Sequence, residues 1–519
     1  MSATRLTTGA LVGAVIAIAV AGCGSSSSQQ TSPEVVTTVL VNKDKAIARN
    51  LEVPVLLADR SDSSTVYLFG VELLTGQCRF YTSADRGYTW TLGTAPSLTP
   101  YTFCGPGSAR PVNFRASMVQ GSEGTLFIAY AGVDPTAGGS RSILVARSTD
   151  KGHNWTTVAV DAAPPASTTG YAEEDFEPHL AVDNSDPKHL FVAWRRSYAD
   201  TPGKTLPGTR AWGAESTNGG VTFSSPARMF DKRIGFDPPY PVIVNRTVYV
   251  TWHQTFPAPS DSAPAPKDRL YCSSSTDGGK SWTDNVIDQG KSNNVATPIL
   301  VHDSSRSRFY TFWDDDRNGS LDVFFSTSTD GKSWSPAVRL DNDPSKGRDH
   351  LLPAAAVAPN GRIDVVWYDY RNDPYPAAPT GGNLGNRNDV YSASSFDGGA
   401  TWTPNVRVND LLIDRLKGTW NNQYFIEVPP AVASTDTAAV AAWSDTRNGD
   451  AHTETQDLYA APLAFDSSAI PAGFAGATVP GYNRTDLLVV GVIAGLAGLL
   501  GGIGLALLFA VRVMRRQRA

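Results

Sequence analysis

The sequence predicts an all-β protein, a seven-bladed β-propeller, followed by one C-terminal transmembrane helix. Three observations predict this: a short turn motif that recurs six times, a set of strand-like segments repeated around each copy, and a strand-like segment near the N-terminus that would complete the last repeat. A six-bladed ring is the alternative that these repeats leave open.

The turn motif has the pattern Ser-x-Asp-x-Gly-x-x-Trp, usually with Thr or Ser before the Trp. Complete copies begin at Ser83, Ser148, Ser275 and Ser395, and altered copies occupy Ser216–Phe223 and Ser328–Trp334. The Asp is expected to accept hydrogen bonds from backbone N–H groups of the turn, and the Gly to adopt a positive φ. The aromatic residue is expected to pack the hairpin onto neighbouring strands. The motif is therefore a folding device.

This motif resembles the Asp-box, or bacterial neuraminidase repeat, of the sialidase superfamily. The resemblance implies a propeller over residues 34–466 in which each box joins the third and fourth strands of a blade, on the face away from the ligand. The last unit, Val428–Phe465, has three strand-like segments and no box. We expect its missing strand to be Glu34–Val41, lying beside the segment near Tyr459, because pairing the two ends removes exposed sheet edges.

The two ends of the chain predict export and membrane attachment. Residues 1–22 read as a lipoprotein signal peptide with Cys23 as the lipidated residue, a plain secretory signal being the alternative, and residues 23–33 form a Ser/Gln tether. After a linker at 467–486, the apolar run 487–511 is long enough to span a bilayer, and the Arg-rich tail 512–519 predicts a cytoplasmic C-terminus. The propeller is expected to be extracytoplasmic at the cell membrane.

Composition excludes one class of partner and predicts a disulfide. The net charge of -6 leaves no basic footprint for nucleic acid. In an oxidising compartment we expect a disulfide between Cys78 and Cys104, and we expect Cys272 to be a buried small apolar residue.

A second repeated motif, Trp-x-Asp-x-Arg-Asn, falls on the face opposite the Asp-boxes. Its acid and base pairs are Asp315/Arg317, Asp369/Arg371 and Asp445/Arg447. Three Arg side chains from neighbouring blades would suit a carboxylate ligand. The alternative is that each loop pairs with itself and is structural, because function usually breaks repeat symmetry.

Residues that break the repeat symmetry are the better candidates for function. They occur in the connections between blades, which are long enough to carry a ligand site. The ligand-binding candidates there are Arg348 and His350, the weak catalytic candidates are Glu174, Asp175, Tyr424 and Glu427, and further members of these connections are Glu173, Glu177, Asp237, Tyr240 and Asp349.

The acidic run after Trp313 resembles an oxygen-rich calcium loop. Asp314, Asp316, Asn318 and Asp322 would be its ligands. Phe325 stands where such a loop has its twelfth-position Glu, and a solvated acidic turn is the alternative. We expect no required cofactor, and calcium is the one ion that the loop suggests.

Two functions remain open. In the sialidase superfamily a first-strand Arg-Ile-Pro motif binds the substrate carboxylate, and the corresponding residues here are Glu52, Val53 and Pro54. Because an acid would repel that carboxylate, the sequence favours a propeller that binds a glycan or protein ligand without sialidase catalysis. An exo-sialidase or another glycoside hydrolase is the alternative.

Overall fold

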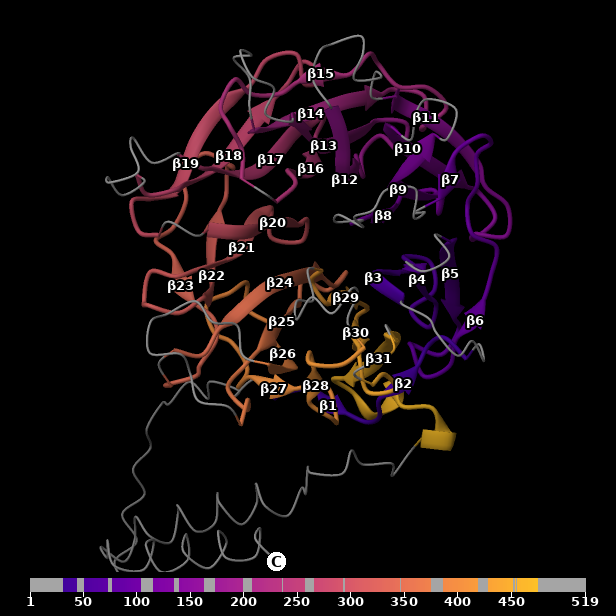
Figure 1. The fold of residues 1–519 in the computed structure, drawn as a ribbon, viewed down its shortest axis with the longest axis vertical. Helices are drawn as coiled ribbons and strands as arrows, with labels where there is room; N and C mark the ends of the chain where they lie inside the picture. The colour runs from indigo at the N-terminus through magenta and orange to yellow at the C-terminus, as the bar shows by residue number, and fades with distance from the viewer. Residues whose placement is uncertain are drawn as a thin grey trace, which may run out of the picture.

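The computed structural model describes residues 31–43, 51–72, 77–103, 115–134, 140–162, 173–198, 208–235, 237–256, 266–292, 295–345, 347–374, 386–418, 428–450, 453 and 455–474. Seven antiparallel sheets stand in a ring around a central axis (Figure 1). The all-β, seven-bladed propeller is thus confirmed, and the six-bladed alternative is wrong.

The first four blades follow one another along the chain. Each has its first strand nearest the axis and its fourth strand at the rim. Their strands are β3 (Leu51–Ala58), β4 (Val66–Glu72), β5 (Gln77–Ser83) and β6 (Thr91–Leu92); β8 (Ser117–Gln120), β9 (Leu126–Asp134), β10 (Ser140–Ser148) and β11 (Thr156–Ala162), with β7 (Thr102–Phe103) beside β9; β12 (Glu173–Val182), β13 (Leu190–Tyr198), β14 (Gly208–Ser216) and β15 (Ala227–Arg228); and β16 (Tyr240–Val244), β17 (Thr247–Gln254), β18 (Arg269–Ser275) and β19 (Thr283–Gln289).

The last three blades complete the ring. Their strands are β20 (Val295–Asp303), β21 (Arg308–Asp315), β22 (Asp322–Ser328) and β23 (Val338–Arg339); β24 (His350–Val357), β25 (Ile363–Asp369), β26 (Arg387–Ser395) and β27 (Val406–Arg407), with β28 (Ile413–Asp414) beside β26; and β29 (Ala431–Ser434), β30 (Ala438–Asp445) and β31 (Asp457–Ala464), with β1 (Glu34–Val35) and β2 (Val39–Leu40). Two short 3-10 helices follow, Ser467–Ala469 and Ala472–Phe474.

The N-terminal segment closes the ring as predicted. Val35 pairs with Leu463, and Leu40 pairs with Tyr459, so β1 and β2 together form the outer strand of the seventh blade. The Asn42 amide also donates to Asp457 at 2.7 Å. Closing the ring with strands from opposite ends of the chain covers the edge of β31 that would otherwise be unpaired.

The Asp-boxes make the contacts expected of them. In the first box Asp85 accepts from the backbone N–H of Thr89 at 2.8 Å, and Gly87 has φ +91°. Box tryptophans also reach the preceding blade, where the ring of Trp155 meets Phe80 edge-on at 5.3 Å. The same edge contact joins Trp282 to Phe191 and Trp402 to Phe325.

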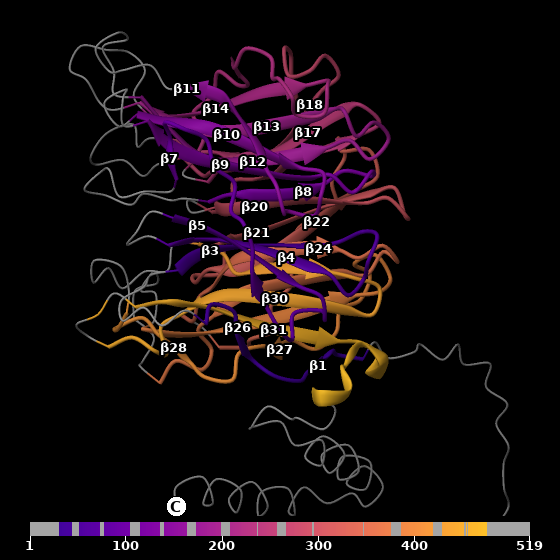
Figure 2. The ribbon, with the colours of Figure 1, turned by 90° about the vertical axis from the view of Figure 1, so that its right-hand side faces the viewer.

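Both described chain ends lie on the Asp-box face. Ala438 pairs with Ala464 at one end of β30, and Asp445 pairs with Asp457 at the other. The chain therefore leaves β31 at the end opposite the Asp-x-Arg loops. Phe474 then packs on Tyr88 of the first Asp-box, with ring centroids 4.7 Å apart. In Figure 2, β1 and the two 3-10 helices lie on the side away from β28.

Among the described residues no helix is long and apolar enough to cross a membrane, and the predicted span 487–511 lies outside them. The predicted signal peptide and Cys23 also lie outside. Cys78 is disulfide-bonded, and its expected partner Cys104 is again outside the described residues. Cys272 is free and buried, as predicted, and burial raises the pKa of its thiol.

Candidate functional site

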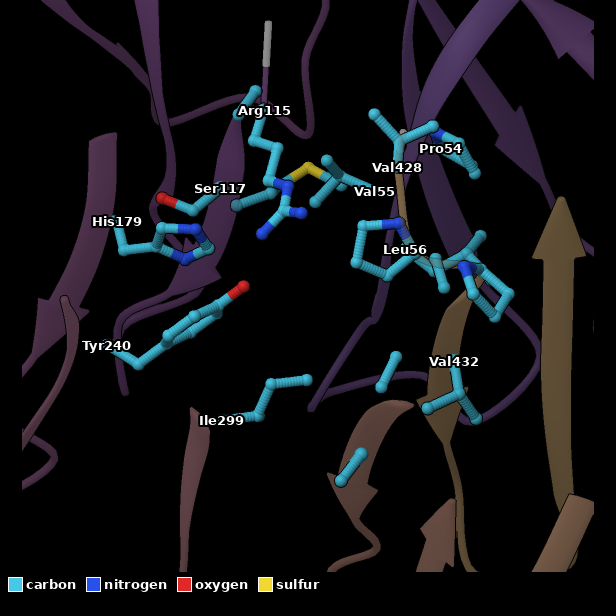
Figure 3. A pocket seen from close by; sticks show the side chains of 17 residues that line it. Pro54, Val55, Leu56, Arg115, Ser117, His179, Tyr240, Ile299, Val428 and Val432 are labelled. Atoms are coloured by element: carbon cyan, nitrogen blue, oxygen red, sulfur yellow. The ribbon is translucent and has the colours of Figure 1, made fainter. Parts of the chain in front are cut away.

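A cavity of about 190 Å³ lies on the propeller axis. The innermost strands of all seven blades line it, each with at least one residue (Figure 3), and Pro429 and Pro430, just before β29, also line it. Its size is below the roughly 300–1,000 Å³ of pockets for drug-sized ligands, so it fits one small ring or chain end rather than an extended molecule.

The wall of this cavity is divided by chemistry. The polar side chains, Arg115, Ser117, His179 and Tyr240, all come from the second, third and fourth blades. The other four blades contribute Val, Leu, Ile, Ala and Pro side chains. A ligand with one polar edge and one apolar face would match this division.

Four of the innermost strands contain a bulge next to a proline, which shapes the cavity wall. The strand register shifts at Val53-Pro54, Glu177-Pro178, Thr297-Pro298 and Leu352-Pro353. Proline cannot donate to the sheet and is found in strands mainly at bulges or edges. Glu177 has φ +51° and Leu352 has φ +55°, values that are strained for residues with a side chain.

The Glu177 bulge places a carboxylate beneath the polar wall. The Glu177 side chain is fully buried and pairs with Arg195 at 2.6 Å and with Arg115 at 3.6 Å. Arg115 also pairs with Asp237 at 3.0 Å. The Arg115 guanidinium is therefore held between two carboxylates, whose charges compensate it and the neighbouring Arg195.

Burial disfavours the charged forms of two further groups, His179 in the cavity wall and Asp314, which does not line the cavity. Burial, with the charge of Arg115, lowers the pKa of His179 to about 3, so its imidazole is neutral. The Nε2 atom of His179 is buried without a hydrogen-bond partner, and its ring lies 4.0 Å from the ring of Tyr240. Burial, with the charge of Asp237, raises the pKa of Asp314 well above its usual range.

The Asp-x-Arg loops have the contacts of the structural alternative. Arg371 pairs with Asp369 of its own loop at 2.7 Å, and Arg447 pairs with Asp445 at 2.8 Å. Arg317 likewise pairs with its own Asp315 and also with Asp288. In each loop the Asp also accepts from the indole of the buried Trp two residues earlier. These guanidinium groups do not line the central cavity.

The four residues of the expected calcium loop have different partners. Asp314 accepts from the backbone of Leu352 at 3.0 Å, whereas Asp316 accepts from Ser292. Asn318 donates to Asp322 at 2.7 Å. Only Asp322 belongs to a group with metal-ligand spacing, and its companions there are Asp341 and His350.

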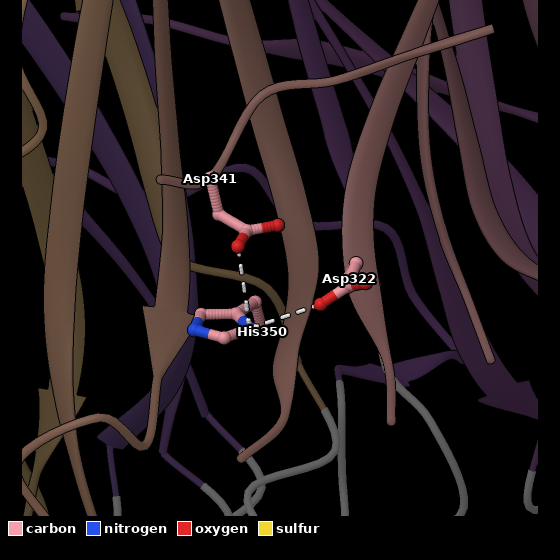
Figure 4. A group of neighbouring side chains, drawn as sticks. All are labelled: Asp322, Asp341 and His350. Atoms are coloured by element: carbon pink, nitrogen blue, oxygen red, sulfur yellow. Dashed lines mark ion pairs between the residues drawn. The ribbon is translucent and has the colours of Figure 1, made fainter. Parts of the chain in front are cut away.

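His350 lies in an acidic cluster between the fifth and sixth blades (Figure 4). Its side chain is completely buried. Around it lie Asp322 and Asp341 on the Nδ1 side and Asp343 and Asp369 on the Nε2 side. Although burial opposes it, these carboxylates raise the pKa of His350 to about 10.

The other residues predicted to be catalytic or ligand-binding have separate environments. Asp175 is buried and accepts two hydrogen bonds from Arg196, and its burial raises its pKa to about 7. Glu174 pairs with Ser197 in the strand register of β12. Arg348 is half-buried. Tyr424 and Glu427 lie outside the described residues.

Sequence reasoning identified part of the cavity wall. Tyr240, with Asp237 and Glu177 behind it, was expected among the residues that break repeat symmetry. Arg115 and His179 were missed. The available signal was their position on or beside innermost strands, since Arg115 lies just before β8 and His179 follows the Glu177-Pro178 bulge of β12.

Comparison with known proteins identifies the family. The model of the BNR repeat-like domain matches residues 124–411, more than half of the chain. The protein therefore belongs to the BNR-repeat propellers, and the resemblance to the sialidase superfamily is confirmed. No curated protein matches the sequence.

Solved structures with similar folds share little sequence with the chain. A protein of unknown function from Dyadobacter fermentans is 13% identical, with a TM-score of 0.45, over 84% of this chain and 100% of that one. The α-L-arabinofuranosidase Arb93A from Fusarium graminearum is 10% identical, with a TM-score of 0.44, over 83% and 98%. The Hadza microbial sialidase Hz136 is 12% identical, with a TM-score of 0.41, over 85% and 98%.

Proposed function

We propose that this protein is a cell-surface carbohydrate-binding propeller that takes one uncharged sugar unit of a glycan into its central cavity. The observation that carries the proposal is the division of the cavity wall into a polar side and an apolar side. A sugar ring has hydroxyl groups at its edge and C–H groups on its face. The unpartnered Nε2 of His179 and the hydroxyl of Tyr240 are the groups that would bind the hydroxyls.

An uncharged sugar suits the electrostatics better than sialic acid does. Arg115 is the cation of the cavity wall, and two carboxylates already flank it. A ligand carboxylate would meet the charges of Glu177 and Asp237 as well as that of Arg115. Neutral sugars pay no such electrostatic cost.

Hydrolysis of a glycosidic bond is the second candidate function. It is favoured by the raised pKa of Asp314, because a general acid must hold its proton at neutral pH. The charge of Asp237 acts on Asp314, and a protonated carboxyl near a second carboxylate is the pair that most glycosidases use.

Attachment to the membrane forms part of the proposal. The predicted lipidation site and the predicted transmembrane span would both anchor the propeller. The first strand begins at Glu34 and the described part ends at Phe474, both on the Asp-box face. Two anchors on this face would turn it toward the bilayer and present the Asp-x-Arg face outward.

The test is glycan-array binding by the full chain in detergent micelles. We expect neutral glycans to bind and their sialylated counterparts to bind less. Tyr240→Phe should weaken binding about tenfold, the effect of one lost hydrogen bond with its partner left buried. Tyr249→Phe is the matched control, because Tyr249 lies in the same blade and does not line the cavity.

Three results would contradict the proposal. Equal loss of binding in the Tyr240 and Tyr249 variants would place the ligand elsewhere. A preference for sialylated glycans would refute the electrostatic argument. Turnover of a bound glycan, abolished by Asp314→Asn, would establish the hydrolase instead of the binder.

A further inference from the structure

We propose that Asp322, Asp341 and His350 form a binding site for a divalent transition-metal ion such as Zn²⁺. The site lies between the fifth and sixth blades, where β22 and β24 begin (Figure 4). It is separate from the central cavity, which none of the three residues lines.

The spacing of the donor atoms fits one small ion. Nδ1 of His350 is 3.5 Å from an oxygen of Asp322 and 3.6 Å from an oxygen of Asp341, and all three atoms lie within 4.8 Å of one another. Zinc binds imidazole nitrogen and carboxylate oxygen at about 2.0–2.2 Å, which separates tetrahedral ligands by roughly 3.4 Å. The observed separations are longer than the roughly 2.7–2.9 Å of a good charge-assisted hydrogen bond.

The His350 side chain is the independent observation that points to a ligand. It is 0% exposed, and neither ring nitrogen makes a hydrogen bond of good geometry, although carboxylate oxygens lie 3.3–3.6 Å from both nitrogens. Its Nε2 atom lies 3.3 Å from Asp343, whose other carboxylate oxygen accepts from the backbone N–H of Ser345. A histidine that binds a metal through one nitrogen commonly directs the other at a carboxylate.

Comparison with the sister blades shows that this cluster departs from the repeat. In the sixth blade Asn409 stands at the position of Asp341 and donates to Asp389 at 2.9 Å. In the seventh blade Asn42 does the same with Asp457. Each Asn also accepts from a backbone N–H, as Asp341 does from Val323.

Asp341 stands where the sister blades have Asn. It therefore still accepts a hydrogen bond from the backbone, but it has no side-chain N–H to donate. A carboxylate cannot donate a hydrogen bond to Asp322. Of the fifth, sixth and seventh blades, the fifth alone therefore has two carboxylates facing each other at this position. A metal ion would compensate both charges.

Arg339 is the group that shares these oxygens. Its Nη2 atom lies 3.0 Å from Asp322 and also contacts Asp341. Arg339 is 32% exposed on its side chain, so it can turn toward solvent when an ion binds. The position of its charged nitrogen marks where a cation is stabilised between the two carboxylates.

The ligand set selects the class of ion. Imidazole suits zinc and its neighbours, whereas calcium and magnesium prefer oxygen alone. Three protein ligands leave a fourth position for water or for a group of a bound partner.

The test compares the untagged full chain with Asp341→Asn, which installs the arrangement that the sixth and seventh blades already use. With Zn²⁺ in excess we expect the wild-type melting temperature to rise by roughly 3–6 °C. Metal analysis after dialysis should give about one more zinc per wild-type chain than per Asp341→Asn chain. Asp186→Asn, a surface substitution in the third blade, should behave as wild type.

The outcomes distinguish a metal-binding site from a cluster of ion pairs that binds no metal. A stabilised wild type with an unresponsive Asp341→Asn variant supports the metal site, and Co²⁺ should then give four-coordinate visible absorption in the wild type alone. No response of the wild type to Zn²⁺, or the same response in both proteins, would overturn it. A response to Ca²⁺ that equals the response to Zn²⁺ would contradict the assigned ion class.

Discussion

Glu177 is expected to determine both the stability of the propeller and the charge preference of its cavity. Its buried carboxylate contacts Arg195 at 2.6 Å and Arg115 at 3.6 Å. Glu177→Gln preserves the shape and removes the charge. Loss of one partner from a buried ion pair costs about 3–5 kcal/mol. Because Asp237 remains beside Arg115, we expect the free energy of unfolding to fall by about 3 kcal/mol, the lower end of this range.

Denaturant unfolding and thermal melting measure this cost. Three kcal/mol corresponds to a lower melting temperature by roughly 3–6 °C, because the shift per kcal/mol falls as a chain grows. The matched control is Glu215→Gln. Glu215 pairs with His189 at 2.9 Å but is 22% exposed, so its substitution should cost less than about 1 kcal/mol.

The same variant tests the electrostatic argument for an uncharged ligand. Removing the charge of Glu177 leaves the cavity wall more positive, so sialylated glycans should bind better relative to neutral ones. Unchanged stability together with unchanged ligand preference would refute the reasoning, because it would mean that the buried carboxylate compensates neither guanidinium.

Two further predictions concern a turn glycine and a cavity histidine. Gly152→Ala should lower the free energy of unfolding by about 2–4 kcal/mol, because the new Cβ would lie 2.3 Å from the Phe80 side chain. Gly124→Ala, with a similar φ but open space around it, should cost about 1 kcal/mol. Equal costs would refute the steric explanation. His179 has a folded pKa of about 3 and an unfolded pKa near 6.5, so the unfolded chain binds more protons between these values and stability falls as the pH falls through this window. Between pH 7 and pH 5 denaturant midpoints should show that His179→Gln loses about 1–2 kcal/mol less than wild type, and equal losses would contradict the assignment.

The repeat made most of the fold predictable. Each complete Asp-box is a local device, because its Asp accepts from a backbone N–H four residues later within the same turn. Counting strands per box then gave seven blades, and the strand missing at the end of the chain located the closing segment beside Tyr459. These inferences depend on contacts near in sequence or on the requirement that a ring close.

The cavity wall was predictable only in part, because ring closure creates it. Arg115, Glu177 and Asp237 come from three successive blades, and no spacing in the sequence places their side chains together. The bulge at Glu177 had a visible signal, a proline inside a strand-like segment. That signal does not say which way the preceding side chain turns.

The two proposed sites share a physical reason for their position in the repeat. Where the blades agree, as in the Asp-x-Arg loops, each Arg pairs with the Asp of its own loop. A single ligand on the axis has no sevenfold symmetry, so the groups that bind it must differ from blade to blade. The cavity concentrates its polar groups in three blades, and the cluster around His350 replaces the Asn of its sister blades with Asp341. Binding is therefore expected at buried positions that depart from the repeat, whereas the positions that keep the repeat contribute to stability.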